Sequence, residues 1–217
     1  MIVFYRMSQM LRNARVIVFV FFCLAFVIQM VYIWLVFGRL AFYKAKSDRR
    51  VEKPVSVVIT SRDDYYYLQK HLPGILNQDY PEYEVVVVND HSDDETQYLL
   101  DQLSDQYSHL KVINMSHSVS FYPGKKFPLS IGIKSAKHEI LLLTYADCVP
   151  NSPHWIRNMQ IGFDDQTQII VGYGPYQPHK GILNCIIRYY SYFTALQYLS
   201  FALIKIPYMG VGRNLAY

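Results

Sequence analysis

The sequence predicts an α/β domain, with a parallel or mixed sheet covered by helices on both faces, behind one N-terminal transmembrane helix. Short apolar runs rich in β-branched residues alternate with segments of helix length, which is typical of parallel sheets buried on both sides. Before them, residues 16–37 (VIVFVFFCLAFVIQMVYIWLVF) run for twenty-two residues without a charge. That length crosses about 30 Å of hydrocarbon at roughly 1.5 Å per residue.

The apolar run at 16–37 favours a retained anchor over a cleaved signal peptide. It is longer than a signal region, and Tyr32, Trp34 and Phe37 at its end resemble an aromatic belt. Three basic residues precede the run and six follow it within sixteen residues, so the positive-inside bias places the C-terminal side in the cytoplasm. We therefore expect a single-pass protein of the inner or plasma membrane, with an N-terminal tail (1–15) and a basic linker (38–53).

Composition excludes several classes of protein. With 52% hydrophobic residues among 217, the chain can bury one sizeable core. The net charge of +4 is modest and forms no basic run, so we expect no nucleic-acid partner. The three cysteines are far apart and form no CxxC pair, which indicates neither a disulfide framework nor a zinc site.

The elements of the soluble part alternate between strand and helix after Pro54. Predicted strands cover residues 55–60, 84–88, 111–115, 139–144 and 168–173, and predicted helices cover 65–77, 93–107, 127–137 and 153–163. A further helical segment, 182–206, is apolar and aromatic, but Asn184, Arg188 and Gln197 argue against a second membrane span. This segment is either a helix at the membrane interface or a core helix.

Polar clusters follow four of the predicted strands, at residues 61–64, 89–94, 116–126 and 145–148. Ligands of open α/β sheets bind outside the carboxyl ends of the strands. Any single acid here has an alternative role in helix capping, and Ser92 or Asp93 is well placed to cap the helix that follows. Together, the acids and lysines fit a nucleotide with a metal-bridged diphosphate, although neither a GxGxxG nor a GxxxxGK[ST] motif is present.

Five segments, in order and at matching spacing, carry a resemblance to a known family. They are PVSVVITSRDD (54–64), QDYP (78–81), EVVVVNDHSDDET (84–96), PGKKFPLSIGIKSAKHEILLLTYADCVP (123–150) and GVGRNLAY (210–217). In these segments the chain resembles the family 2 glycosyltransferases, which are membrane-linked enzymes with the nucleotide-diphospho-sugar transferase (GT-A) fold. The resemblance covers residues 54–217.

The resemblance implies a nucleotide-binding site at the strand ends. Asp90 would accept a hydrogen bond from the nucleobase, and Arg62 and Asp63 would line the pocket for the base and the ribose. Lys126 would face the diphosphate. The partner implied is a nucleoside diphosphate sugar.

The same resemblance implies a divalent cation, Mg or Mn, bound by Asp147, the last acid of the family's Asp-x-Asp element. Tyr145 stands where the family usually has the first acid, and a neutral phenol can only hydrogen-bond to a ribose or a phosphate oxygen. At position 91 the family more commonly has Gly, and we expect His91 to face solvent in a turn.

For the intact family, the reaction implied is transfer of a sugar to a hydroxyl acceptor with inversion. No residue among the 217 matches the family's acidic general base, so we expect the domain over 54–217 to be incomplete at its C-terminus. The alternative is a non-catalytic membrane protein, or the product of a disrupted gene, that retains only a nucleotide pocket. Neither the sugar, the nucleobase nor the acceptor follows from the sequence.

Overall fold

The computed structural model describes residues 2–44, 52–116, 124–164 and 166–217. Its contacts divide the chain into two compact units. The first unit is Met1–Lys44 with Pro178–Met209, and the second unit is Ala45–Gln177 with Gly210–Tyr217. Residues 45–51 of the predicted basic linker lie outside the described residues.

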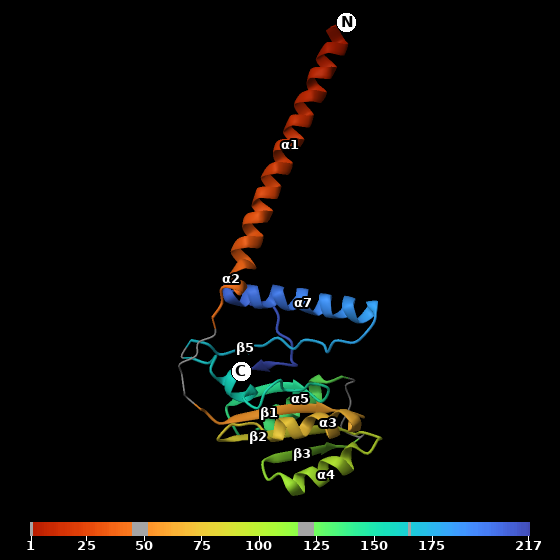
Figure 1. Cartoon of the computed structure of the whole chain (residues 1–217), viewed down its shortest axis with the longest axis vertical. Helices are drawn as coiled ribbons and strands as arrows, with labels where there is room; N and C mark the ends of the chain where they lie inside the picture. Colours follow the sequence, from red (N-terminus) through yellow and green to blue (C-terminus); the bar gives the residue numbers. More distant parts are fainter. Residues whose placement is uncertain (1, 45–51, 117–123, 165) are drawn as a thin grey trace. The chain divides into compact units, whose positions relative to one another are not determined.

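The first unit is helical (Figure 1). It contains α1 (Ile2–Val36), α2 (Gly38–Ala41) and α7 (Ile182–Leu203), and α2 contacts α7. By length and composition, the segment Arg12–Ala41 is long and apolar enough to cross a membrane, and it includes the predicted run 16–37. It is the one such helix in the described part of the chain.

The second unit is a six-stranded sheet with helices. Its strands are β1 (Val55–Ser61), β2 (Tyr83–Asp90), β3 (Leu110–Met115), β4 (Ile140–Tyr145), β5 (Ile170–Val171) and β6 (Leu215–Ala216). Its helices are α3 (Tyr65–Leu76), α4 (Thr96–Gln106), α5 (Lys126–Ser135) and α6 (Trp155–Gln160).

The strand order is β3-β2-β1-β4-β6-β5 (Figure 1). Strands β1 to β4 run parallel, and β6 pairs antiparallel with both β4 and β5. From β1 the chain first builds outward through β2 and β3, and then crosses back to place β4 on the other side of β1. The order therefore reverses between β1 and β4, where ligands bind in such sheets.

The central strands are buried on both faces, as their continuous apolar runs predict. On one face, alternate residues such as Val57 and Val87 pack in a cluster that includes Leu68 of α3 and Leu100 of α4. On the other face, Val86 and Val88 form a separate cluster with residues of α5. The predicted sheet with helices on both faces is confirmed.

Glycine lets α5 lie close to the sheet. An added Cβ at Gly132 of α5 would lie 2.6 Å from Val58 Cγ1 and 3.0 Å from Val88 Cγ2. Both distances are shorter than an ordinary van der Waals contact between carbon atoms. The small residue therefore fixes how near α5 approaches β1 and β2, and with it the position of the lysines at the start of α5.

The strand predicted at 168–173 is mostly wrong. Only Ile170–Val171 form β5, both residues are half-buried, and Ile169 is 59% exposed. Because β6 occupies the place beside β4, β5 pairs with β6 at the edge of the sheet. The apolar run at 168–173 therefore does not become a buried parallel strand.

Candidate functional site

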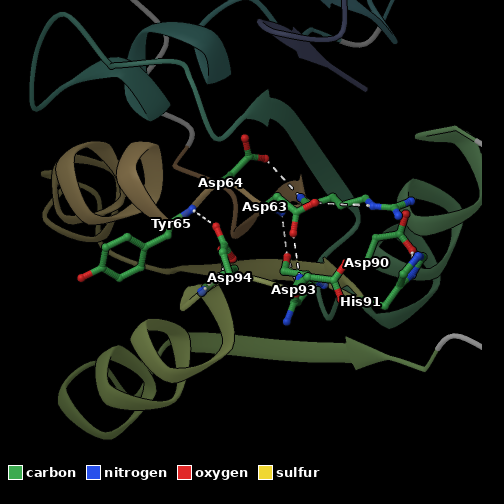
Figure 2. Close-up of polar contacts among 11 residues, drawn as sticks. Asp63, Asp64, Tyr65, Asp90, His91, Asp93 and Asp94 are labelled. Atoms are coloured by element: carbon green, nitrogen blue, oxygen red, sulfur yellow. Dashed lines mark hydrogen bonds and ion pairs between the residues drawn. The ribbon is translucent and has the colours of Figure 1, made fainter.

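The loops after β1 and β2 are joined through Asp63 and Ser92 (Figure 2). The Asp63 N–H donates to Ser92 Oγ at 2.9 Å, and Asp63 Oδ1 accepts from the Asp93 N–H at 2.7 Å. Ser92 Oγ in turn donates to Asn89 Oδ1 at 2.6 Å. Asp63 has a positive φ of 53°, a conformation that Asp tolerates better than most residues. These four residues form a clamp, and we use this name for them below.

Asp94 holds the starts of two helices. Its Oδ2 accepts from the N–H of Tyr65, the first residue of α3, at 3.1 Å, and its Oδ1 accepts from the N–H of Thr96, the first residue of α4, at 3.0 Å. Burial raises the pKa of Asp94, but the hydrogen bonds from Thr96 and Tyr65 outweigh it, so the pKa is lowered. The prediction that Ser92 or Asp93 caps the helix is wrong, because α4 begins only at Thr96 and the Thr96 N–H donates to Asp94.

Asp90 ends β2 with a largely buried side chain, and His91 covers it (Figure 2). His91 Nδ1 lies 2.7 Å from Asp90 Oδ1, and the His91 side chain is only 8% exposed. The prediction that His91 faces solvent is therefore wrong. Its positive φ of 43° belongs to the left-handed region that glycine favours, and in this conformation the imidazole lies against the carboxylate. His91 thus helps to fix the orientation of Asp90.

Tyr145 ends β4 and is enclosed by two other segments. Lys125 Nζ lies 4.7 Å from the centroid of the Tyr145 ring, within the range of a cation–π contact. On another side, an added Cβ at Gly212 would lie 3.0 Å from the Tyr145 hydroxyl oxygen. Lys126, which we predicted at the diphosphate, is the exposed first residue of α5. The lysine that contacts the strand end is its neighbour, Lys125.

Asp147 lies two residues beyond β4 and is exposed. Cys148 Sγ donates to Asp147 Oδ1 at 3.4 Å. Burial and the charge of Asp147 raise the pKa of the Cys148 thiol. The thiol therefore stays protonated beside the carboxylate.

Asp64 lies just beyond the end of β1, at the start of α3. Its Oδ2 accepts from the Arg62 N–H at 3.2 Å. Burial raises its pKa, the hydrogen bond from Arg62 and the charge of Lys125 act in the opposite direction, and the charge of Asp147 adds to the rise. The net effect is a raised pKa for Asp64, the acid that follows the loop after β1.

The six predicted site residues fall into two groups. Arg62, Asp63 and Asp90 lie in and beside the clamp, where Arg62 Nε is 3.9 Å from Asp63 Oδ2. Tyr145 and Asp147 lie at the end of β4, and Lys126 begins α5. Residues 117–123 of the predicted cluster 116–126 lie outside the described residues.

Sequence reasoning missed Asp64 and Lys125. Each is one member of a pair of like residues, Asp63-Asp64 and Lys125-Lys126, and the other member was selected in both cases. The pairs themselves were the available signal, but only the structure separates their members: Asp63 belongs to the clamp, and Lys125 lies over Tyr145.

The donor set fits a cation only in part. Mg²⁺ and similar ions prefer oxygen ligands, and often take one or two carboxylates together with the phosphates of a substrate. Asp147 offers one exposed carboxylate. Within the described ranges, no three His, Cys, Asp or Glu side chains come together as a metal-binding group. A cation here would depend on phosphate oxygens for most of its ligands.

The chain is similar in sequence to two curated glycosyltransferases. Glycosyltransferase AglE of Haloferax volcanii is 30% identical over 104 residues, 47% of this chain and 33% of that protein. An uncharacterized glycosyltransferase of Haemophilus influenzae is 25% identical over 122 residues, 56% of this chain and 36% of that protein. The chain thus spans about a third of the length of these curated relatives.

Among solved structures, the mannosyltransferase PcManGT of Pyrobaculum calidifontis, in complex with GDP-Man and Mn²⁺, is similar with a TM-score of 0.66 and 18% identity. The match covers 87% of this chain and 51% of that chain, and it confirms the predicted GT-A fold. The family model described as "Glycosyltransferase like family 2" matches residues 53–214. The chain therefore belongs to the family 2 glycosyltransferases.

Proposed function

We propose that this chain forms the donor-binding part of a membrane-anchored glycosyltransferase that uses a nucleoside diphosphate sugar. The observation that carries the proposal is the placement of Asp90 and Asp147 at or just beyond the carboxyl ends of β2 and β4, with Lys125 over Tyr145 beside the switch point. Carboxylates and an amine at one strand edge suit a diphosphate with its cation. The family and the nucleotide sugar in the PcManGT complex support the same donor class.

In this proposal each described residue has a separate role. Asp90, oriented by His91, accepts a hydrogen bond from the nucleobase. Arg62 lines the base and ribose, and Asp63 holds the loop that carries Arg62 in place. The Tyr145 hydroxyl donates to a ribose or phosphate oxygen.

The diphosphate is held at the other end of the same site. Lys125 and Lys126 attract it, and Asp147 binds the divalent cation, Mg²⁺ or Mn²⁺, through one carboxylate. When bound, that cation would stabilise the charge of the departing diphosphate. We infer inversion at the sugar carbon and a hydroxyl acceptor from the family, and we assign no residue of this chain as the general base.

Membrane attachment belongs to the same proposal. The segment Arg12–Ala41 crosses the bilayer. The basic residues that follow the apolar run 16–37, among them Arg39 and Lys44, put the nucleotide-binding unit on the cytoplasmic side in this proposal. Cytosolic nucleotide sugars then have direct access to the site.

A second candidate function is nucleotide binding without catalysis. One observation favours it: Tyr145 stands where a second acid would strengthen the cation site, and the described part of the chain has no three-residue metal group. The two candidates differ in turnover, because only the first consumes a donor in the presence of a cation.

The test is binding of GDP and UDP to the full chain in nanodiscs, measured by calorimetry with Mn²⁺. Asp90→Ala should weaken the binding of one of them by about tenfold to a hundredfold, because a hydrogen bond to a charged group contributes about 1.5–3 kcal/mol. Asp105→Ala, an exposed acid on α4, is the matched control. Equal affinity in the Asp90 variant would reject the site, and binding without donor consumption would favour the second candidate.

A further inference from the structure

The first unit carries no acidic residue. Met1–Lys44 and Pro178–Met209 contain 8 of the chain's 21 Lys and Arg residues and none of its 17 Asp and Glu residues. All of the carboxylate side chains therefore belong to the second unit, where the candidate site is. Five of the eight basic residues follow the apolar run 16–37 and so lie on the same side of the span as α7, where they favour a surface of negative charge.

Helix α7 presents an apolar stripe to its surroundings. Five exposed apolar residues at positions i, i+4, i+7, i+8 and i+11 share one helical face and form this stripe: Ile182, Ile186, Tyr189, Tyr190 and Phe193. Three more exposed apolar residues, Leu183, Ile187 and Tyr192, flank it on other faces of α7. Tyr189 and Tyr190 are 66% and 72% exposed, and the Tyr189 ring stacks on that of Phe193 at a centroid distance of 6.2 Å. Tyrosine suits the boundary between lipid and water, because its ring is apolar and its hydroxyl is polar.

The position of α7 within the first unit connects it to the membrane segment. The segment Arg12–Ala41 ends with α2, and α2 contacts α7 (Figure 1). Residues that contact the end of a membrane span lie at the level of the lipid headgroups. Lys180, Arg188 and Lys205, in and around α7, are long enough to reach phosphates there while their stems stay in the apolar layer.

We propose that α7 lies in the interface of the bilayer and recognises anionic lipid, as a second membrane contact beside the span. Its apolar stripe enters the boundary between headgroups and acyl chains, and its basic residues bind lipid phosphates and carboxylates. The inference rests on the membrane anchoring in the proposed function, and is independent of the nucleotide site.

Two alternatives for the apolar stripe of α7, a contact with a second copy of the chain and a transmembrane position, agree less well with the polar and basic residues of the first unit. A second copy of the first unit would bring together two surfaces that each carry the unit's five basic residues after position 37 and no negative group, and like charges oppose such an association. Asn184, Arg188 and Gln197 on α7 disfavour a transmembrane position. An anionic lipid surface would bury the apolar stripe and pair with the basic residues of the first unit.

Cys185 provides a probe on α7 itself, because it is exposed. The full chain with Cys23→Ser and Cys148→Ser is labelled at Cys185 with the environment-sensitive dye NBD. It is then reconstituted in vesicles of phosphatidylcholine, with or without phosphatidylserine. Flotation of the vesicles reports anchoring, and quenching by lipids spin-labelled at shallow or deep positions reports the depth of α7.

We expect blue-shifted emission, with stronger quenching by the shallow spin label, in vesicles that contain phosphatidylserine. Without phosphatidylserine, the ratio of docked to undocked α7 should fall by about tenfold. Lys180→Gln with Arg188→Gln should remove that lipid dependence, whereas Lys70→Gln with Lys134→Gln, two exposed lysines of the second unit, should preserve it. Tyr189→Ser with Tyr190→Ser should reduce the quenching, and Tyr98→Ser, 74% exposed on α4, should not.

Three results would overturn the inference while the anchor stands, provided that the chain floats with the vesicles. They are a water-exposed label in both lipid mixtures, stronger quenching by the deep spin label, and a blue shift without any lipid quenching, which would mean that protein covers α7. A chain that does not float would reject the anchor and this inference together. Nucleotide affinity is measured separately, so failure of the donor site is recognised independently.

Discussion

Ser92→Ala tests whether the clamp holds the two loops of the candidate site. The substitution removes the hydrogen bond from the Asp63 N–H at 2.9 Å and the bond to Asn89 Oδ1 at 2.6 Å. Two bonds contribute about 1–3 kcal/mol to the free energy of unfolding. Asn89 Oδ1 keeps the Ser92 N–H at 3.3 Å, and the exposed Asp63 N–H gains water, so we expect a loss near the lower end, about 1–2 kcal/mol.

The assay is urea unfolding of the full chain in detergent micelles, followed by tryptophan fluorescence. With a slope of about 2 kcal/mol per molar urea, the midpoint should fall by roughly 0.5–1 M. Nucleotide affinity should fall as well, because the loop bearing Arg62 loses its support. Ser104→Ala is the matched control, since its Oγ makes one exposed bond within α4, to the Asp101 carbonyl oxygen. A midpoint shift for Ser92→Ala no larger than that of the control would refute the role of the clamp.

Three further predictions concern packing, titration and the cation. Gly132→Ala should destabilise the fold by about 1–3 kcal/mol through crowding against the sheet, whereas Gly74→Ala, in a helix with nothing within 4 Å of its added Cβ, should raise the urea midpoint. The pKa of Asp64 is raised in the folded state, so protonation of this carboxylate favours folding. The wild type should therefore gain stability relative to Asp64→Asn as pH falls from 7 through that pKa toward the usual 3.8. A difference in unfolding midpoint that stays constant with pH would contradict this sign. Tyr145→Asp should strengthen Mn²⁺-dependent nucleotide binding by about tenfold, because a second carboxylate would lie near Asp147. Tyr145→Asn, which adds no charge, should not. If calorimetry gives the two variants equal affinity, a cation beside Asp147 is excluded.

The sequence predicts the central sheet well and its edge poorly. The runs around Val57 and Val86 are long, apolar and β-branched, so both their type and their burial follow from composition. Strands β5 and β6 have two residues each, and no periodic pattern exists over so short a stretch. Their antiparallel pairing depends on residues more than forty positions apart, which local propensity does not describe.

The candidate site was predictable as a place but not in its internal contacts. The rule that ligands bind beyond the strand ends locates the loops that hold Asp63, Asp90 and Asp147. The inward position of His91 depends on its positive φ. The family's more common Gly at this position is consistent with a positive φ, but it does not predict where a histidine side chain would point. The choice of Lys125 over Lys126 depends on where α5 begins, and helix ends are the least certain feature of a sequence-based prediction.

The place of β6 in the sheet has a consequence for the order of folding. Leu141 and Tyr217 exchange backbone hydrogen bonds of 2.7 and 3.0 Å across 76 positions of the chain, and the intervening sequence includes all of α7. Strands β1 to β4 can pair as soon as they are synthesised, but the free edge of β4 must wait until residues 215–217 emerge, and such distant pairings form slowly. During that interval an unpaired, apolar edge is exposed, so nascent chains should be most prone to aggregate just before β6 is complete.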